Sequence, residues 1–301
     1  MSSASNTPGG GPPTLLDVTS LKAGFGARVS GLQISAAPSA VDVTAVRELW
    51  HRHKLLVLPA QQVEEPDLVG FSAALGKLEI HVRAEYLSPQ HPELLYVSNM
   101  RREGRTIGIL ADREVGWHYD QIYLPKPAVG SLLCAVTLPE AGGDTYFADM
   151  VSAYAALPAR TRERLAGAEA IQSYAAFNAM YSVPTTPEQA ARTPDLRQPV
   201  VRTHPYTGEQ ALYLCPGMTT RITGMAQHES DALLQELFDW SVQERFVYRH
   251  RWEKGDCVLW DNAATMHRRD PFSGGERLMK RTTILPDDDR ARPFYRAESS
   301  T

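Results

Sequence analysis

The side chains best suited to binding a metal ion lie in the short segment His118-Tyr119-Asp120 and, much later in the chain, at His267. Side chains two positions apart in a β-strand point to the same face, so His118 and Asp120 could reach one ion together. Two imidazoles and one carboxylate leave the other positions of a metal open, which is the ligand set of non-haem Fe(II) oxygenases. We therefore expect His118, Asp120 and His267 to form a metal site.

Two arginines follow His267 in a segment with the pattern of a strand. Arg277 and Arg281 are four positions apart, so they share a face of the strand and lie about 13 Å from each other at the rise of a strand. This distance is too long for both side chains to hold one carboxylate. Because each guanidinium can bind a carboxylate through two parallel N–H groups, the pair indicates two separate anion sites. The competing interpretation is two surface arginines beside Lys280.

Two further histidine groups have spacings that resemble metal ligands. His91-Pro92-Glu93 also has one residue between a histidine and a carboxylate, but with nine histidines and 35 acidic residues in the chain about one such motif arises by chance. Its proline places it in a turn, so we expect a solvated loop. His51 and His53 end a predicted helix, where this spacing points the side chains apart. We expect neither group to bind metal.

The composition is that of a soluble globular enzyme with a small-molecule substrate. Of the 301 residues, 43% are hydrophobic and 22% are charged, which suffices for one large core or two modest ones. A formal net charge of −4 gives no basic surface for nucleic acid. No apolar run approaches the roughly 20 residues that cross a bilayer, and the first residues lack the features of a signal peptide. We therefore expect a cytoplasmic protein without nucleic-acid or membrane partners.

The three cysteines do not suggest a disulfide framework. Cys134, Cys215 and Cys257 are odd in number and far apart, and each has apolar neighbours. They also lack the spacing of a zinc site. We expect three buried, reduced thiols.

Short strand-like segments dominate the chain, and few helices accompany them. Apolar or alternating stretches bounded by glycine and proline predict strands over residues 55–58, 94–98, 117–123, 128–137, 144–148, 199–204, 211–214, 246–252, 256–260 and 277–285. Helical spacing predicts helices over residues 41–53, 149–166 with an interruption at Pro158, and 229–242. This count favours a mainly β fold, a jelly roll or cupin-like barrel with peripheral helices.

The candidate metal ligands are spread over a long stretch of the chain, and dividing it into domains would separate them. We therefore expect a single catalytic domain over residues 14–295. Residues 1–13 are rich in Ser, Gly and Pro and cannot bury enough apolar surface to order themselves, so we expect a flexible leader. Residues 296–301 are expected to be a tail. The sequence leaves a homo-oligomer, a dimer or a tetramer, open.

With these residues identified, the chain resembles the TauD/TfdA family of dioxygenases, which depend on Fe(II) and 2-oxoglutarate. The similarity covers about residues 20–295. It is carried by residues 117–120, 142–145, 199–205, 246–252 and 277–283, together with Trp260-Asp261-Asn262 and His267. Any one of these motifs would be a weak signal, whereas their combination is specific.

The resemblance implies a double-stranded β-helix and an iron ion held by His118, Asp120 and His267. It also implies that Thr145 and Arg277 bind the distal carboxylate of 2-oxoglutarate, whose keto-acid end chelates the metal. Dioxygen is then the other cosubstrate.

The resemblance also suggests substrate contacts. Arg281 matches the arginine that binds a sulfonate or carboxylate in family members with acidic substrates, and His81 matches a substrate-contacting histidine of taurine dioxygenase. The chain departs from the taurine enzyme in the residues that follow His81, up to Tyr86, and at Glu114, where that enzyme has an asparagine near the substrate amine. The resemblance therefore does not extend to taurine itself, and Arg281, His81, Tyr86 and Glu114 are the expected substrate contacts.

The expected activity is oxidation of a C–H bond in a small carboxylate or sulfonate, by hydroxylation with or without cleavage of a carbon–heteroatom bond. Two other classes fit parts of the pattern. A cupin-like metal hydrolase or isomerase would use the same three ligands but would not need Thr145 and Arg277. A non-enzymatic sensor would bind 2-oxoglutarate without forming succinate, and the complete ligand set speaks against it.

Overall fold

Two β-sheets form the centre of the fold. The computed structural model describes residues 15–22, 24–109, 113–180 and 186–287. In spatial order, the larger sheet consists of β1 (Asp17–Lys22), β2 (Phe25–Ser30), β3 (Leu55–Leu58), β17 (Cys257–Asp261), β8 (Gly130–Thr137), β20 (Leu278–Ile284) and β4 (Leu94–Ser98). The smaller sheet consists of β16 (Val247–His250), β10 (Thr145–Asp149), β18 (Thr265–Arg269) and β7 (Val115–His118). Neighbouring strands in both sheets are antiparallel, except β2 and β3.

Side chains from the two sheets meet in a shared core. Phe147 of β10 packs in one cluster with Trp260 of β17 and Leu55 of β3. The next residue of β3, Leu56, belongs instead to a second cluster, on the other face of the larger sheet. This alternation is the period of two that a strand imposes, and it gives the larger sheet two buried faces.

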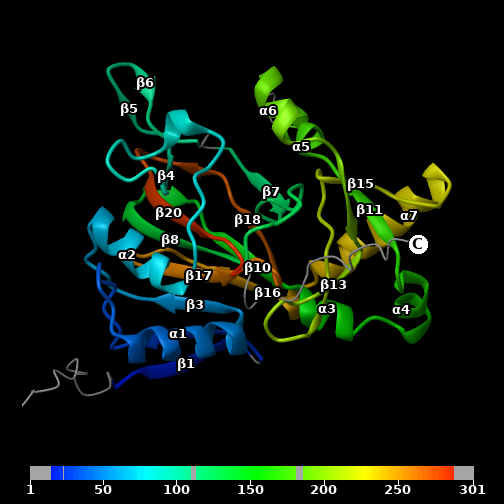
Figure 1. Cartoon of the computed structure of the whole chain (residues 1–301), viewed down its shortest axis with the longest axis horizontal. Coiled ribbons are helices and arrows are strands. Elements are labelled where there is room, and N and C mark those ends of the chain that lie inside the picture. Colours follow the sequence, from blue (N-terminus) through cyan, green and yellow to red (C-terminus); the bar gives the residue numbers. More distant parts are fainter. Residues whose placement is uncertain (1–14, 23, 110–112, 181–185, 288–301) are drawn as a thin grey trace, which may run out of the picture.

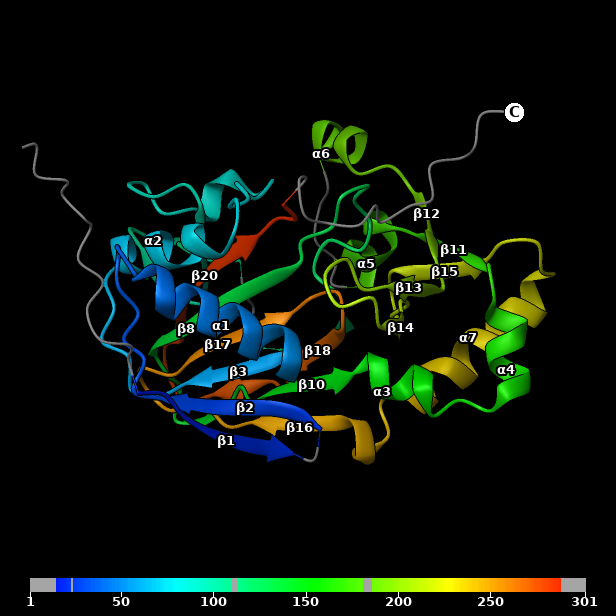
Figure 2. The ribbon, with the colours of Figure 1, turned by 60° about the horizontal axis from the view of Figure 1, so that its bottom comes forward.

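Helices cover the outer face of the larger sheet. α1 (Ala40–His53) runs alongside β3 and β17 in Figure 2, with α2 (Glu65–Leu75) close by. Trp50 of α1 and Phe71 of α2 are buried in the second cluster together with Leu56. The helices therefore bury the side chains that point away from the smaller sheet.

A third region packs against the smaller sheet through Ala148 and Met266, and it lies on the right in Figure 1. Its helices are α3 (Met150–Ala155), α4 (Ala159–Leu165), α5 (Tyr174–Met180), α6 (Pro187–Arg192) and α7 (Gln227–Ser241). Its strands are β11 (Glu169–Gln172), β12 (Leu196–Pro199), β13 (Val201–Thr203), β14 (Gln210–Leu212) and β15 (Thr219–Ile222). The remaining short elements are η1 (Ala84–Tyr86), β5 (Arg101–Arg102), β6 (Arg105–Thr106), β9 (Ala141–Gly142), η2 (Glu244–Phe246) and β19 (Phe272–Ser273).

The two sheets with outer helices confirm the predicted fold class, a mainly β double-stranded β-helix. The predicted helices appear as α1, as α3 followed by α4, and as α7, and Pro158 separates α3 from α4 as predicted. The sequence patterns did not predict α2, although a capping box between Glu64 and Asp67 marks its start. They also missed β1 and β2, which form an edge hairpin with a largely exposed first strand.

The prediction of three reduced thiols is wrong for two of the cysteines. Cys134 and Cys257 form a disulfide, because they are direct partners in the antiparallel pairing of β8 with β17. Their separation of 123 residues along the sequence hides this pairing. Cys215 is free and buried, as predicted.

Three predictions about the organisation of the chain remain open. The leader at residues 1–13 and the tail at 296–301 lie outside the described residues, and the single domain over 14–295 stays a prediction. Among the residues that the structure describes, no helix is long and apolar enough to cross a membrane.

Gly130, at the start of β8, is a position where added volume should be costly. A Cβ atom there would lie 2.1 Å from Cζ2 of Trp50, a side chain that is only 2% exposed and cannot move away. We predict that Gly130→Ala lowers the free energy of unfolding by about 3 kcal/mol, measured by urea denaturation. The control is Gly104→Ala, where a Cβ meets nothing within 4 Å and the positive φ alone should cost about 1 kcal/mol. Equal losses for the two variants would contradict the packing described here.

Candidate active site

Strand pairing brings the two candidate histidine ligands together. β18 lies between β10 and β7 in the smaller sheet, and His267 is the direct partner of His118 in the pairing with β7. Side chains of directly opposed residues lie on the same face of an antiparallel pair. The two imidazole rings accordingly have centroids 4.2 Å apart, although they are far apart in sequence.

Asp120 reaches these histidines from a turn. The predicted strand over residues 117–123 is wrong beyond His118, where β7 ends, because the chain turns at Gln121, whose φ is +60°. Ligand atoms of His118, Asp120 and His267 nonetheless lie within 4.8 Å of one another. Nδ1 of His118 lies 2.8 Å from the carbonyl oxygen of Gly116 and donates to it, so Nε2 keeps its lone pair for a metal ion.

The three side chains are in the protonation states that a metal ion requires. Ser131 Oγ donates to one carboxylate oxygen of Asp120 at 3.0 Å, and Arg281 Nη1 donates to the other at 3.0 Å. Burial by itself would raise the pKa of Asp120, but Arg281 and the two histidines outweigh it and hold the pKa below its ordinary value. Burial lowers the pKa of His118 and, further, that of His267. At neutral pH the site therefore offers one carboxylate and two neutral imidazoles.

Arg277 carries a buried positive charge that no described carboxylate balances. The residue is 1% exposed, and its Nε and Nη1 have no hydrogen-bond partner among the described residues. Burial, and then Arg269, lower its pKa to about 9, so it stays charged at neutral pH. The hydroxyl oxygen of Thr145 accepts a hydrogen bond from Trp252 Nε1 at 2.9 Å, which leaves the hydroxyl hydrogen free to donate. Arg277 and Thr145 together could hold a carboxylate.

One pocket, with a cavity volume of about 310 Å³, is lined by His118, Asp120, His267, Thr145, Arg277 and Arg281. Such a volume is at the low end for a ligand site and suits small molecules. Five arginines and two carboxylates contribute to its wall, which gives an excess of positive charge that favours anions. The arginines are Arg83, Arg113, Arg269, Arg277 and Arg281, and the carboxylates are Glu114 and Asp120.

Apolar and aromatic side chains form most of the remaining wall. They include Leu95, Val97, Ile109, Val115, Leu133, Tyr123, Tyr174, Phe177, Met218 and Trp260. An apolar wall with a few charged groups can enclose the body of a ligand while the charges orient it. The pocket therefore suits an anion that carries an apolar part.

The four predicted substrate contacts all line this pocket, but their surroundings differ. His81 Nδ1 accepts a hydrogen bond from the backbone of Arg83 at 3.1 Å, and burial, followed by Arg281, lowers its pKa to about 4. It is therefore a neutral donor through Nε2. Glu114 is more than half exposed and pairs with Arg268 at 3.4 Å, and Tyr86 is half-buried.

Sequence reasoning missed three arginines of the pocket, Arg83, Arg113 and Arg269. Arg269 stands two positions after His267 in β18, so the same rule of alternation that joined His118 to Asp120 could have found it. No comparable signal marks Arg83, which lies in an irregular segment just before η1. Its guanidinium is 3.6 Å from Glu85.

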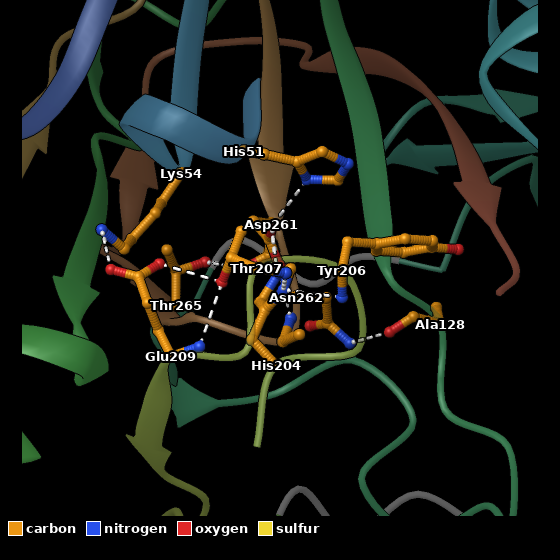
Figure 3. A network of polar contacts seen from close by, with 11 residues as sticks. His51, Lys54, Ala128, His204, Tyr206, Thr207, Glu209, Asp261, Asn262 and Thr265 are labelled. Carbon is orange, nitrogen blue, oxygen red and sulfur yellow. Dashed lines mark hydrogen bonds and ion pairs between the residues drawn. The ribbon is translucent and has the colours of Figure 1, made fainter. Parts of the chain in front are cut away.

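A second group of potential ligands lies outside the pocket. Figure 3 shows His51 of α1, His204 and Asp261 converging, with ligand atoms within 4.8 Å of one another. The sequence pattern paired His51 with His53 and did not indicate these partners. The other discounted motif, His91-Pro92-Glu93, forms the turn before β4, as predicted.

Known proteins resemble this chain both in sequence and in fold. Residues 17–283 match the family "Taurine catabolism dioxygenase TauD, TfdA family". The alpha-ketoglutarate-dependent 2,4-dichlorophenoxyacetate dioxygenase of Cupriavidus pinatubonensis is 32% identical over 275 residues, which cover 87% of this chain and 95% of the relative. The pentalenolactone F synthase of Streptomyces avermitilis is 31% identical and covers 93% of this chain and 97% of its own length.

A solved structure has the same arrangement of elements. The crystal structure of AAD-2 in complex with Mn(II) and N-oxalylglycine superposes with a TM-score of 0.80 at 27% identity, covering 94% of this chain and 99% of that one. The match therefore extends over nearly the full length of both proteins. On this ground, and on the family match over residues 17–283, the chain belongs to the TauD/TfdA family of dioxygenases that depend on 2-oxoglutarate, also called alpha-ketoglutarate.

Proposed function

We propose that the chain is a dioxygenase that requires Fe(II), 2-oxoglutarate and dioxygen, and that it oxidises a C–H bond of a small carboxylate or sulfonate with an apolar body. One observation carries the proposal. The two histidines and the aspartate open onto the same small pocket as Arg277, a buried cation without a described counterion. A metal hydrolase or isomerase would need the two histidines and the aspartate but would not need Arg277.

His118, Asp120 and His267 would hold the iron. Their donor atoms are close enough for one ion, and two imidazoles with one carboxylate suit a metal that must keep positions free for other ligands. The iron, when bound, supplies the oxidising chemistry that couples decarboxylation of 2-oxoglutarate to succinate and carbon dioxide with oxidation of the substrate. The protein supplies ligand geometry, charge and a pocket of defined shape.

Arg277 and Thr145 would bind the distal carboxylate of 2-oxoglutarate. A guanidinium held in a buried site favours a planar anion that can satisfy its N–H groups, and the Thr145 hydroxyl has a hydrogen to add. The name of the Cupriavidus relative records dependence on alpha-ketoglutarate, and N-oxalylglycine in AAD-2 is likewise an acid with a carboxylate at each end. Both agree with a diacid in this pocket.

The substrate's anionic group would bind near Arg281 and His81. Arg281 gives one N–H to Asp120, while its Nε has no hydrogen-bond partner among the described residues. The same side chain can therefore hold both the candidate metal ligand Asp120 and the substrate. Neutral His81 would add a donor. Aromatic residues such as Phe177 and Tyr86 would contact the apolar body of the substrate. Glu114, which is more than half exposed, would discriminate between substrates at the rim of the pocket. The relative named for 2,4-dichlorophenoxyacetate, an aromatic carboxylate, supports this combination.

Succinate formation tests the proposed activity. Protein reconstituted with Fe(II) under anaerobic conditions and then given 2-oxoglutarate, air and a panel of aryloxy carboxylates, alkyl carboxylates and sulfonates should release succinate faster with one class of substrate. His118→Ala should lower this rate at least 100-fold, because one of three metal ligands is lost. Arg281→Met should raise KM for the anionic substrate more than it lowers kcat for saturating substrate.

The alternatives give different results in the same assay. A sensor would bind 2-oxoglutarate and release no succinate with any member of the panel. A hydrolase or isomerase would act without 2-oxoglutarate and would keep its activity when Arg277 is replaced.

We expect Arg277 to lower the stability of the ligand-free protein while it serves to bind 2-oxoglutarate. Its unpaired buried N–H groups cost free energy that a methionine of similar length would not. We predict that Arg277→Met raises the free energy of unfolding of the ligand-free protein by about 1 to 2 kcal/mol while abolishing 2-oxoglutarate binding, measured by urea denaturation and calorimetry.

The matched control for this prediction is Arg281→Met. Arg281 is paired with buried Asp120 at 3.0 Å, so its loss should destabilise the protein by about 3 kcal/mol. Destabilisation by Arg277→Met, or 2-oxoglutarate binding at wild-type affinity in that variant, would argue against the assigned role.

A further inference from the structure

We infer that Asn262 positions the candidate metal ligand Asp120 by hydrogen-bonding both backbone groups of that residue, and that it thereby sets the metal affinity of the site. The inference rests on the metal site of the proposed function. It assigns Asn262 a positioning role only, since its side chain is not among the groups that line the pocket.

The side-chain amide of Asn262 replaces a missing strand partner. β7 ends at His118, so no strand pairing holds the backbone of Asp120. Asn262 Oδ1 accepts a hydrogen bond from the Asp120 N–H at 3.0 Å, and Asn262 Nδ2 donates to the Asp120 carbonyl at 2.7 Å. Nδ2 also donates to the Ala128 carbonyl at 3.0 Å, a contact drawn in Figure 3. One amide thus holds both backbone groups of the residue that carries the carboxylate and ties that residue to Ala128.

Asn262 is itself fixed by its surroundings. It is completely buried, and its backbone N–H donates to the Val129 carbonyl at 2.9 Å. The preceding residue, Asp261, accepts hydrogen bonds from His204 Nε2 and from the Ala263 backbone, both at 2.8 Å. The backbone carbonyl of Asp261 also accepts from Thr265 Oγ at 2.7 Å, two positions before His267. The same turn therefore anchors the segments of two candidate ligands.

The group formed by His51, His204 and Asp261 supports this turn and does not bind metal. His204 Nδ1 accepts hydrogen bonds from the backbone N–H groups of Tyr206 and Thr207 at 3.2 and 3.0 Å, so Nδ1 carries no hydrogen. In a neutral ring the hydrogen is then on Nε2, which donates it to Asp261. Both nitrogens of His204 are occupied, and neither offers a lone pair to a cation.

The precision of the Asp120 backbone matters because the metal imposes narrow distances on its ligands. If the residues that support a metal ligand let it move by about 1 Å, the productive geometry of the site is lost. Loss of outer partners of metal ligands typically costs 10- to 100-fold in metal affinity. Asn262 should have an effect of this size although it never touches the ion.

Gln61 offers a matched control elsewhere in the molecule. It is also a buried amide, and it makes the same set of bonds. Its Oε1 accepts from the Ile34 N–H at 2.9 Å, and its Nε2 donates to the carbonyls of Leu32 and Pro59 at 2.9 and 3.1 Å. Gln61→Ala should therefore destabilise the fold as Asn262→Ala does, without reaching the metal site.

The test is the affinity of the purified protein for Mn(II) by calorimetry, with thermal melting as the measure of fold stability. Asn262→Ala should weaken Mn(II) binding 10- to 100-fold, and Gln61→Ala should leave it within about twofold of wild type at a similar loss of melting temperature. If Asn262→Ala does not fold, Asn262→Ser, whose hydroxyl can replace one of the lost bonds, is measured in its place with the same expected direction.

Three results would overturn the inference: wild-type Mn(II) affinity in a folded Asn262 variant, an equal loss in Gln61→Ala, or no Mn(II) binding by the wild-type protein. Failure of the proposed activity alone is distinguishable from the first two of these results. A wild-type protein that binds Mn(II) but forms no succinate would contradict the proposed activity. A loss of Mn(II) affinity confined to the Asn262 variants would still support the positioning role.

Discussion

The site depends on the antiparallel pairing of β18 with its two neighbours. On one side, β7 sets His118 directly opposite His267, and on the other side β10 sets Thr145 directly opposite Arg269. A shift of either pairing by one residue would turn the side chains of one strand to the other face of the sheet. The imidazole pair therefore depends on the register of β18 with β7, and the position of Thr145 beside Arg269 depends on the register of β18 with β10.

The buried charges of the site lower the stability of the ligand-free protein. The charge of Asp120 is balanced by Arg281, and Ser131 donates a hydrogen bond to the carboxylate, whereas the Arg277 cation is buried beside another arginine, Arg269. Burial of an unpaired cation is unfavourable unless an anion joins it. The ligand-free protein thus holds a site whose best counterion is the proposed diacid, and binding of that diacid should stabilise the folded state.

Local patterns in the sequence predicted much of the fold and the site, and they failed where the geometry depends on distant contacts. Strand alternation and helix spacing placed the main strands and α1, α3 and α7, and the His-x-Asp spacing found two candidate ligands that do come together. The reason offered for that spacing was incomplete, since Asp120 lies in a turn at Gln121, a non-glycine residue with positive φ. The Cys134–Cys257 pair and the contact of His51 with Asp261 depend on sheet order and helix docking, which no local pattern encodes.

A single metal ion is proposed to bind between His118, Asp120 and His267 and to face Arg277 across the pocket. The most direct measurement is the anomalous scattering of crystals grown with Mn(II) and 2-oxoglutarate without oxygen. We expect one strong peak among these three side chains, with a carboxylate of the diacid on Arg277 and Thr145. A peak between His51, His204 and Asp261, or a diacid bound away from Arg277, would contradict it.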